Sequence, residues 1–407
     1  MDNGDGYAFE AHIDDEYMIE TLVELLQEDT AVPLGPETLM EPDHEKLVHF
    51  VQEVFRPKLR EIGVHEIIEL PKNQLAVRMG SGDTDESLLV MAYTPAQHHN
   101  WMENPFSGKI GIPDDPAIDE PCAFGQGAEQ NKAHLAAILT LLKAFVDGET
   151  TIDGTVYFVV NNEARSTHEC SRAMLPELDP TPDQGLLLIG GGNAVQVANR
   201  GRVDVLVHVE GQVTHSSDPD GGLNAIMGAT EVIDRIDAIE FTAEHPTLGR
   251  PHALPYQLSF DPVAPHTLPE YARLKIDRRL LPGEDVDAAV DGIREAIGDM
   301  SPYEVTVEKD VVMEPSVVDP DEPVVRRLQR SIESLDSEPA ELYHAKGAFD
   351  AGGLTNRGIP TVMWGRPERG ETIMGDDYVT LRGVREEVRI VGRTIVDGLS
   401  LPPSASD

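Results

Sequence analysis

The chain has 407 residues, enough for two or three domains with a sizeable core. Asp and Glu total 73 against 32 Lys and Arg, a formal net charge of −41. This charge excludes nucleic-acid binding through a basic patch and argues against binding to anionic membranes. Intrinsic disorder is excluded as well, because 40% of the residues are hydrophobic and apolar runs recur along the whole chain.

The first half of the chain alternates helical and strand patterns. Apolar residues at helical spacing predict helices, and short apolar runs predict strands. The predicted helices are Asp15–Gln27, Leu47–Leu59, Lys132–Phe145 and Thr167–Leu175. The predicted strands are Val64–Leu70, Leu75–Met79, Leu88–Ala92, Thr155–Val160 and Leu186–Ile189, with a loop over Pro95–Pro121. Elements of these lengths in alternation predict an α/β sheet.

A different pattern begins after Gly201. It predicts, in order, strand Val203–Val209, helix Gly222–Ile236, strands Pro255–Phe260 and Ala272–Ile276, helix Val286–Ile297 and strand Tyr303–Lys309. This is a ferredoxin-like order of elements. Helix Pro323–Ser334, strand Thr361–Trp364 and helix Val379–Leu399 return to the first pattern. We therefore predict a discontinuous α/β domain, residues 1–199 and 313–407, with an α+β domain inserted at 200–312.

Several features predict a cytoplasmic protein. Cys122 and Cys170 are the only cysteines, too few for a disulfide framework. No secretory signal and no apolar stretch long enough to span a membrane is visible. The acids are dispersed, and Arg outnumbers Lys by 23 to 9. Such a surface predicts a high-salt cytoplasm, as in haloarchaea, with an unusually acidic mesophilic protein as the alternative.

Four motifs in order resemble the cocatalytic dizinc aminoacylase and carboxypeptidase family, metallopeptidase family twenty. They are Trp101–Gly108, Gly125–Lys132, Arg200–Ser217 with Gly222–Ile226, and Asp277–Glu284. The resemblance runs from about Asp15 to Leu399. It implies a mixed-sheet α/β/α domain with an inserted ferredoxin-like lid, and a homodimer formed through that lid.

The family's metal site is where the sequence departs from the resemblance. Family members hold two zinc ions that polarise a water for attack on an amide carbonyl. The resemblance places the ligands at Tyr93, Pro95, Gln130, Glu163, Gly191 and Ile373, of which only Glu163 can bind as a carboxylate. Asn162 stands in the general-base position, and an amide cannot accept a proton from zinc-bound water. We therefore expect neither an ordinary dizinc hydrolase nor a cofactor.

The residues that handle substrate in the family are largely kept. His215 resembles the lid histidine that stabilises the oxyanion in the neighbouring subunit's site. Arg279 matches the arginine that clamps the substrate carboxylate. Asn224 resembles a lid asparagine, although it is also placed to cap a helix. Asp350 lies in a turn that resembles Gly-Thr-Ser-Asp. Together with Tyr93 and Gln130, these residues predict a pocket for a small carboxylated ligand.

Three functions follow from this pattern. In the first, an amidohydrolase or peptidase homologue binds or acts on an amino-acid-like or N-acyl amino acid ligand without the dizinc centre, with Glu163 and His215 as the acid/base pair. In the second, the chain is an active metal-dependent amide hydrolase, a deacylase or peptidase, whose rebuilt site for zinc or another divalent metal is formed by His98, His99, Glu163 and His168. His134 lies nearby in the sequence. In the third, the chain is a non-catalytic dimer partner of an active paralogue.

Overall fold

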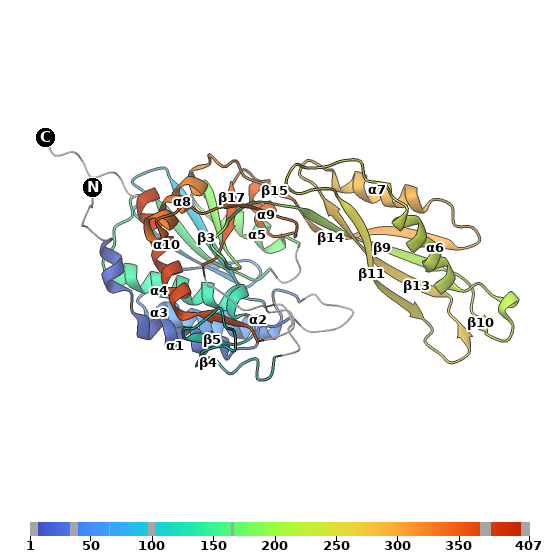
Figure 1. Cartoon of the computed structure of the whole chain (residues 1–407), viewed down its shortest axis with the longest axis horizontal. Helices are drawn as coiled ribbons and strands as arrows, with labels where there is room; N and C mark the ends of the chain where they lie inside the picture. Colours follow the sequence, from blue (N-terminus) through green and yellow to red (C-terminus); the bar gives the residue numbers. More distant parts are fainter. Residues whose placement is uncertain are drawn as a thin grey trace. The chain divides into compact units, whose positions relative to one another are not determined.

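The computed structural model describes residues 7–32, 40–64, 66–96, 102–163, 167–366 and 376–399. The chain divides into two compact units (Figure 1). Unit 1 comprises residues 1–197, 318–343 and 353–407, and unit 2 comprises residues 198–317 and 344–352. Among the helices described, none is both long and apolar enough to cross a membrane.

Unit 1 is built on a mixed sheet with helices on both faces. Its strands are β1 (Ile67–Leu70), β2 (Gln74–Met79), β3 (Ser87–Tyr93), β6 (Thr155–Asn161), β7 (Gln184–Leu188) and β17 (Thr361–Trp364). Neighbours in the sheet follow the order β1-β2-β6-β3-β7-β17. The four central strands, from β6 to β17, are parallel, while β1 and β2 are antiparallel to their neighbours.

Helices complete unit 1. The longer ones are α1 (Asp15–Leu26), α4 (Ala133–Asp147), α8 (Pro323–Asp336) and α10 (Leu381–Leu399). The shorter ones are η1 (Ala8–His12), α2 (Glu45–His49), η2 (Phe50–Phe55), α3 (Arg56–Glu61), η3 (Ala128–Lys132), α5 (Glu169–Met174) and η4 (Leu175–Glu177). A second, three-stranded sheet joins β4 (Lys109–Gly111), β5 (Cys122–Phe124) and β18 (Tyr378–Thr380). Three elements cross the boundaries between the units: β8 (Val195–Asn199), β16 (Leu342–Ala345) and α9 (Ala351–Thr355).

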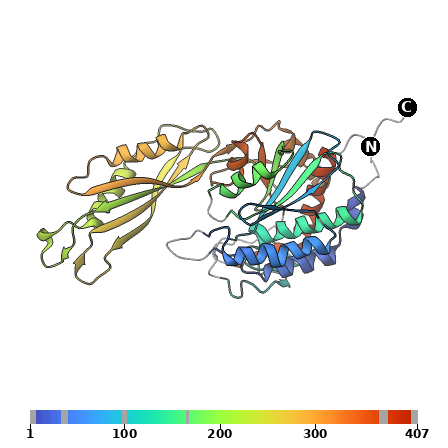
Figure 2. The same ribbon diagram turned by 180° about the vertical axis from the view of Figure 1, so that it is seen from behind.

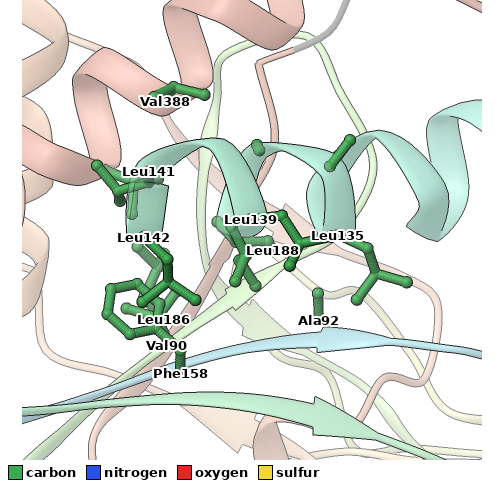
Figure 3. Packing of buried hydrophobic residues seen from close by; sticks show 14 of the residues in the cluster. Val90, Ala92, Leu135, Leu139, Leu141, Leu142, Phe158, Leu186, Leu188 and Val388 are labelled. Carbon is green, nitrogen blue, oxygen red and sulfur yellow. The ribbon is translucent and has the colours of Figure 1, made fainter. Parts of the chain in front are cut away.

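The core of unit 1 lies between the central strands and α4. Leu135, Leu139 and Leu142 of α4 point toward the sheet, whereas Leu141 points toward Val388 of α10 (Figure 3). Because α4 is covered on one side by strands and on the other by helices, it is apolar almost all round. Figure 2 shows α1 running beside α4. β3 and β6 are buried along their whole length, as expected for parallel strands covered on both faces.

Unit 2 has the predicted ferredoxin-like order. Its elements are β9 (Gly201–Glu210), α6 (Ala225–Asp237), β11 (His252–Asp261), β13 (Tyr271–Leu280), α7 (Val286–Ile297) and β14 (Glu304–Met313). The four strands form an antiparallel sheet in the order β11-β13-β9-β14. The apolar faces of α6 and α7 pack against it. Smaller elements are β10 (Thr214–His215), η5 (Pro219–Gly221), β12 (Thr267–Leu268) and β15 (Ser316–Val317).

The structure corrects three of the predicted elements. The strand predicted from Val64 begins only at Ile67. The loop predicted over Pro95–Pro121 contains β4. The last predicted helix starts too early, because Val379 pairs with Ala123 of β5 and α10 begins at Leu381. Val379 is β-branched, and β-branched residues favour a strand over a helix where a partner strand is available.

Candidate functional site

The ends of the parallel strands bring together the unit 1 residues that the sequence predicts for the site. Tyr93 ends β3, and Asn162 and Glu163 directly follow β6. Tyr93 pairs in register with Asn161, so these ends meet at one edge of the sheet. Gln130 lies in η3, and its neighbour Asn131 donates a hydrogen bond of 2.6 Å to the carbonyl of Thr94 just beyond β3. In open α/β sheets ligands bind at this carboxyl edge.

Asn162, at the position of the general base, is fully buried and uses both ends of its amide. Its Nδ2 donates to the carbonyl of Asn73 at 2.7 Å, and its Oδ1 accepts the hydroxyl of Thr94. These bonds connect the loop after β6 with the end of β3 and the β1–β2 turn. The Asn162 side chain therefore has a structural task in this chain.

Glu163, the retained carboxylate, is buried and accepts hydrogen bonds from described residues that lead into α5. Oε1 accepts the backbone N–H of Thr167 at 3.0 Å and its hydroxyl at 3.1 Å. Oε2 accepts the backbone N–H of Cys170 at 2.9 Å. The carboxylate thus satisfies backbone donors at the start of a helix, as a capping side chain does.

Asp377 holds the glycine-rich turn before η3. Its Oδ2 accepts the N–H of Gly127 at 2.7 Å, and its Oδ1 accepts the N–H of Glu129 at 3.3 Å. Gly127 has φ +81°, and a Cβ there would come within 2.5 Å of Asn131 Oδ1, so only glycine fits. Asp377 is not among the residues that the sequence predicts for the site. Its distance from the turn in sequence hid the pairing.

Lys132, the last residue of η3, is a buried amine. Burial lowers the pKa of Lys132 to about 8, although Asp29 and Asp377 act against it. The Lys132 ammonium donates to the carbonyl of Glu28 and lies 5.5 Å from the ring centroid of Phe106.

His134 is fully buried, and its Nδ1 lies 2.8 Å from Oε1 of the equally buried Glu387. Burial alone would lower the pKa of His134, but the Glu387 carboxylate outweighs it and raises the pKa. His134 is therefore bonded to α10.

Residues proposed for a rebuilt metal site are only partly described. His98, His99 and Ile373 lie outside the described residues. His168 is buried, with φ 58°, and its side chain packs against Gly353 of α9. Within the described ranges, no group of three or more His, Cys, Asp or Glu side chains is arranged to hold a metal ion.

The remaining predicted residues belong to unit 2. His215 is exposed, and its Nδ1 accepts the backbone N–H of Ser217 at 3.2 Å and lies 2.8 Å from that residue's hydroxyl. Asn224 caps α6, its Oδ1 accepting the N–H of Ile226 at 3.0 Å. Arg279 pairs with Asp277 at 2.7 Å. Asp350 lies in the short segment 344–352 of the same unit.

His215 and Arg279 lie at opposite ends of the unit 2 sheet. Arg279 pairs in register with Arg202 near the start of β9, while His215 follows the end of that strand. β9 has 10 residues, so its ends are about 30 Å apart. One copy of unit 2 therefore does not bring these two side chains into one site.

Comparison with known proteins finds hydrolases that are similar to this chain. The model of the M20 peptidase dimerisation domain matches residues 197–304. An uncharacterized metallohydrolase of Methanocaldococcus jannaschii is 23% identical over 327 residues, 71% of this chain and 76% of that protein. An acetylornithine deacetylase of Yersinia pseudotuberculosis is 21% identical over 344 residues, 77% of this chain and 80% of that protein.

Solved structures share the fold. A tripeptidase of Staphylococcus aureus has a TM-score of 0.70 at 19% identity, covering 94% of this chain and 98% of its own. An M20 family metallo-carboxypeptidase of Sulfolobus solfataricus has a TM-score of 0.74 at 14% identity, with coverages of 93% and 98%. The predicted resemblance and fold class are confirmed. The chain is a homologue of the M20 peptidases and amidohydrolases: it carries their dimerisation domain and has their fold.

Proposed function

We propose that this M20 homologue binds or acts on a carboxylate-bearing amino-acid-like or N-acyl amino acid ligand without a dizinc centre. The observation that carries the proposal is the donor set at the carboxyl edge of the unit 1 sheet. Tyr93, Pro95, Gln130 and Gly191 supply no carboxylate or imidazole. Zinc sites in proteins use Cys, His, Asp or Glu, so these side chains do not fit a pair of zinc ions.

The state of Glu163 supports the same proposal. Both of its oxygens already accept hydrogen bonds from the segment 167–170, within 3.1 Å. Binding a metal through this carboxylate would compete with those bonds and expose backbone donors at the start of α5. The Oδ1 of Asn162 already accepts the hydroxyl of Thr94, and an amide oxygen is too weakly basic to take a proton from a water molecule.

The ligand class rests on unit 2. Arg279 presents a planar guanidinium that suits a carboxylate, and its hydrogen bond to Asp277 is made by Nη2, one of its three nitrogens. The M20 dimerisation domain and the separation of His215 from Arg279 within one copy support a homodimer. In such a dimer His215 would serve the site of the partner subunit.

Metal analysis and ligand binding test the proposal. After purification in high salt without chelator, followed by incubation with excess Zn²⁺ and desalting, we expect less than about 0.1 equivalent of metal per chain. N-acetylglycine should raise the melting temperature of wild type but not of Arg279→Ala. Light scattering in the same buffer checks the dimer. Two equivalents of tightly bound zinc would overturn the metal-free proposal, and an equal melting shift in Arg279→Ala would overturn the ligand site.

A further inference from the structure

Arg279 belongs to a cluster of cations that is unusual in so acidic a chain. The end of the unit 2 sheet where β9 begins and β13 finishes carries four arginines: Arg200, Arg202, Arg278 and Arg279. Three of them have a carboxylate within 3.2 Å: Arg202 has Asp204, Arg278 has Glu284 and Arg279 has Asp277. The fourth, Arg200, does not.

Arg200 is buried without an acidic partner among the described residues. Its Nε donates to the carbonyl of Leu248 at 2.8 Å, and its Nη1 lies 3.4 Å from Nδ1 of His252. Only 6% of the residue is exposed. Burial and the nearby positive charge of Arg279 both lower the pKa of Arg200. A buried cation beside a second cation is unfavourable unless an anion offsets it.

His252 lies close to both Arg200 and Arg279. It is the register partner of Arg279 on β11, so the imidazole lies between Arg200 and the end of β13. The charged groups that face it are Asp277 and the guanidiniums of Arg200, Arg278 and Arg279. Burial and these guanidiniums lower the pKa of His252, against the opposing effect of Asp277. The neutral ring can donate a hydrogen bond to an anion.

We propose that Arg200 and His252 form, together with Arg279, a monoanion site that takes the single carboxylate of the ligand. The proposal rests on the proposed function and adds two residues to it. Among the described residues, these four arginines have three paired carboxylates, which leaves one positive charge that one ligand carboxylate would neutralise. The fork of Arg279 has five N–H donors, so Asp277 and a ligand can share it. Arg200 and His252 then make the site selective for a ligand with a charged terminus over its uncharged amide.

NMR titration of the His252 imidazole tests this site, with N-acetylglycine as the probe and N-acetylglycinamide as its uncharged match. Saturation with N-acetylglycine should raise the pKa of His252, because a bound anion stabilises the imidazolium, and the amide should leave it unchanged. Arg200→Gln should weaken binding by at least about tenfold. Arg294→Gln is the matched control: this arginine also lies in unit 2 but is exposed and paired with Asp291 on α7, so its loss should change nothing.

Arg200 also donates a hydrogen bond to the carbonyl of Leu248, so its replacement can affect folding, and a second variant is needed as a control. Arg200→Lys keeps the positive charge but loses the planar guanidinium. It should bind N-acetylglycine more tightly than Arg200→Gln does. Circular dichroism checks that both variants are folded. Wild-type affinity in folded Arg200→Gln, or a His252 pKa that stays fixed at saturation, would overturn the inference. If Arg279→Ala abolishes binding while Arg200→Gln does not, the proposed function survives alone. If wild type binds neither probe, both fail.

Discussion

Lys132 is a buried amine whose charge opposes folding at neutral pH. Its pKa of about 8 in the folded chain lies below the ordinary 10.5, so the unfolded chain holds the proton more strongly. Stability therefore rises as pH increases from 8 to 10.5, where the folded chain binds fewer protons than the unfolded one. We predict that the free energy of unfolding, relative to Lys132→Met, increases by about 3 kcal/mol over this range.

Chemical denaturation at constant ionic strength checks this prediction. Lys143→Met is the control, because Lys143 lies on α4, which directly follows η3, but is paired with Asp147 near the surface, and its pKa is raised instead. The difference in free energy of unfolding between wild type and Lys143→Met should show no such increase above pH 8. If the difference in free energy of unfolding between wild type and Lys132→Met does not change with pH, the Lys132 ammonium is better solvated than its contacts imply.

The residues of the candidate site show what a sequence can predict about single side chains. The strand pattern located Tyr93, Asn162 and Glu163 at strand ends, and the structure brings those ends together. The sequence did not reveal that Glu163 is already bonded to 167–170, or that Asn162 joins two loops. Hydrogen bonds to a backbone depend on local turns, and a turn around His168 with φ 58° leaves no periodic signal.

At the scale of elements, the long amphipathic and fully apolar segments were predicted well. α7 and β17 have the predicted bounds, β9 and β13 extend beyond the predicted ends, and β14 begins one residue later than predicted and ends four residues later. The short strands β4, β5 and β18 were missed because three residues carry no period. The pairing of β5 with β18 also joins segments about 250 residues apart, such as Phe124 and Tyr378. Contacts of that range are set by the fold as a whole and not by local pattern.

Asn224 was predicted as a substrate residue and is observed as the N-cap of α6. We predict that Asn224→Ala lowers the free energy of unfolding by about 1 kcal/mol, because the N–H of Ile226 loses its acceptor. Asn224→Asp keeps a side-chain acceptor and should therefore retain most of the wild-type free energy of unfolding. Asp285→Ala, which removes the cap of α7, is the matched control and should cost a similar amount. An Asn224→Ala variant as stable as wild type would show that the cap contributes nothing.

The charge of the whole molecule leads to a prediction about salt. The formal net charge of −41 creates repulsion that grows when the chain is compact, and the units fold against it. At 0.1 M salt, charges interact over about 10 Å, and at 1 M over about 3 Å. Screening to this length removes most of the repulsion between dispersed carboxylates but leaves buried contacts such as His134–Glu387 intact. We therefore predict that raising KCl from 0.1 to 2 M increases the melting temperature by roughly 10 °C or more.

Differential scanning calorimetry over a KCl series measures this effect, and the shape of the response separates two causes. Screening acts mainly below about 0.5 M, where the Debye length changes fastest. Exclusion of salt from the surface strengthens apolar burial and continues to act at higher concentrations. Repeating the series at pH 4, near the sequence pI of about 4.5, removes most of the net charge and should flatten the low-salt part of the curve. A melting temperature that is independent of KCl at neutral pH would contradict the repulsion argument and the inference of a high-salt cytoplasm together.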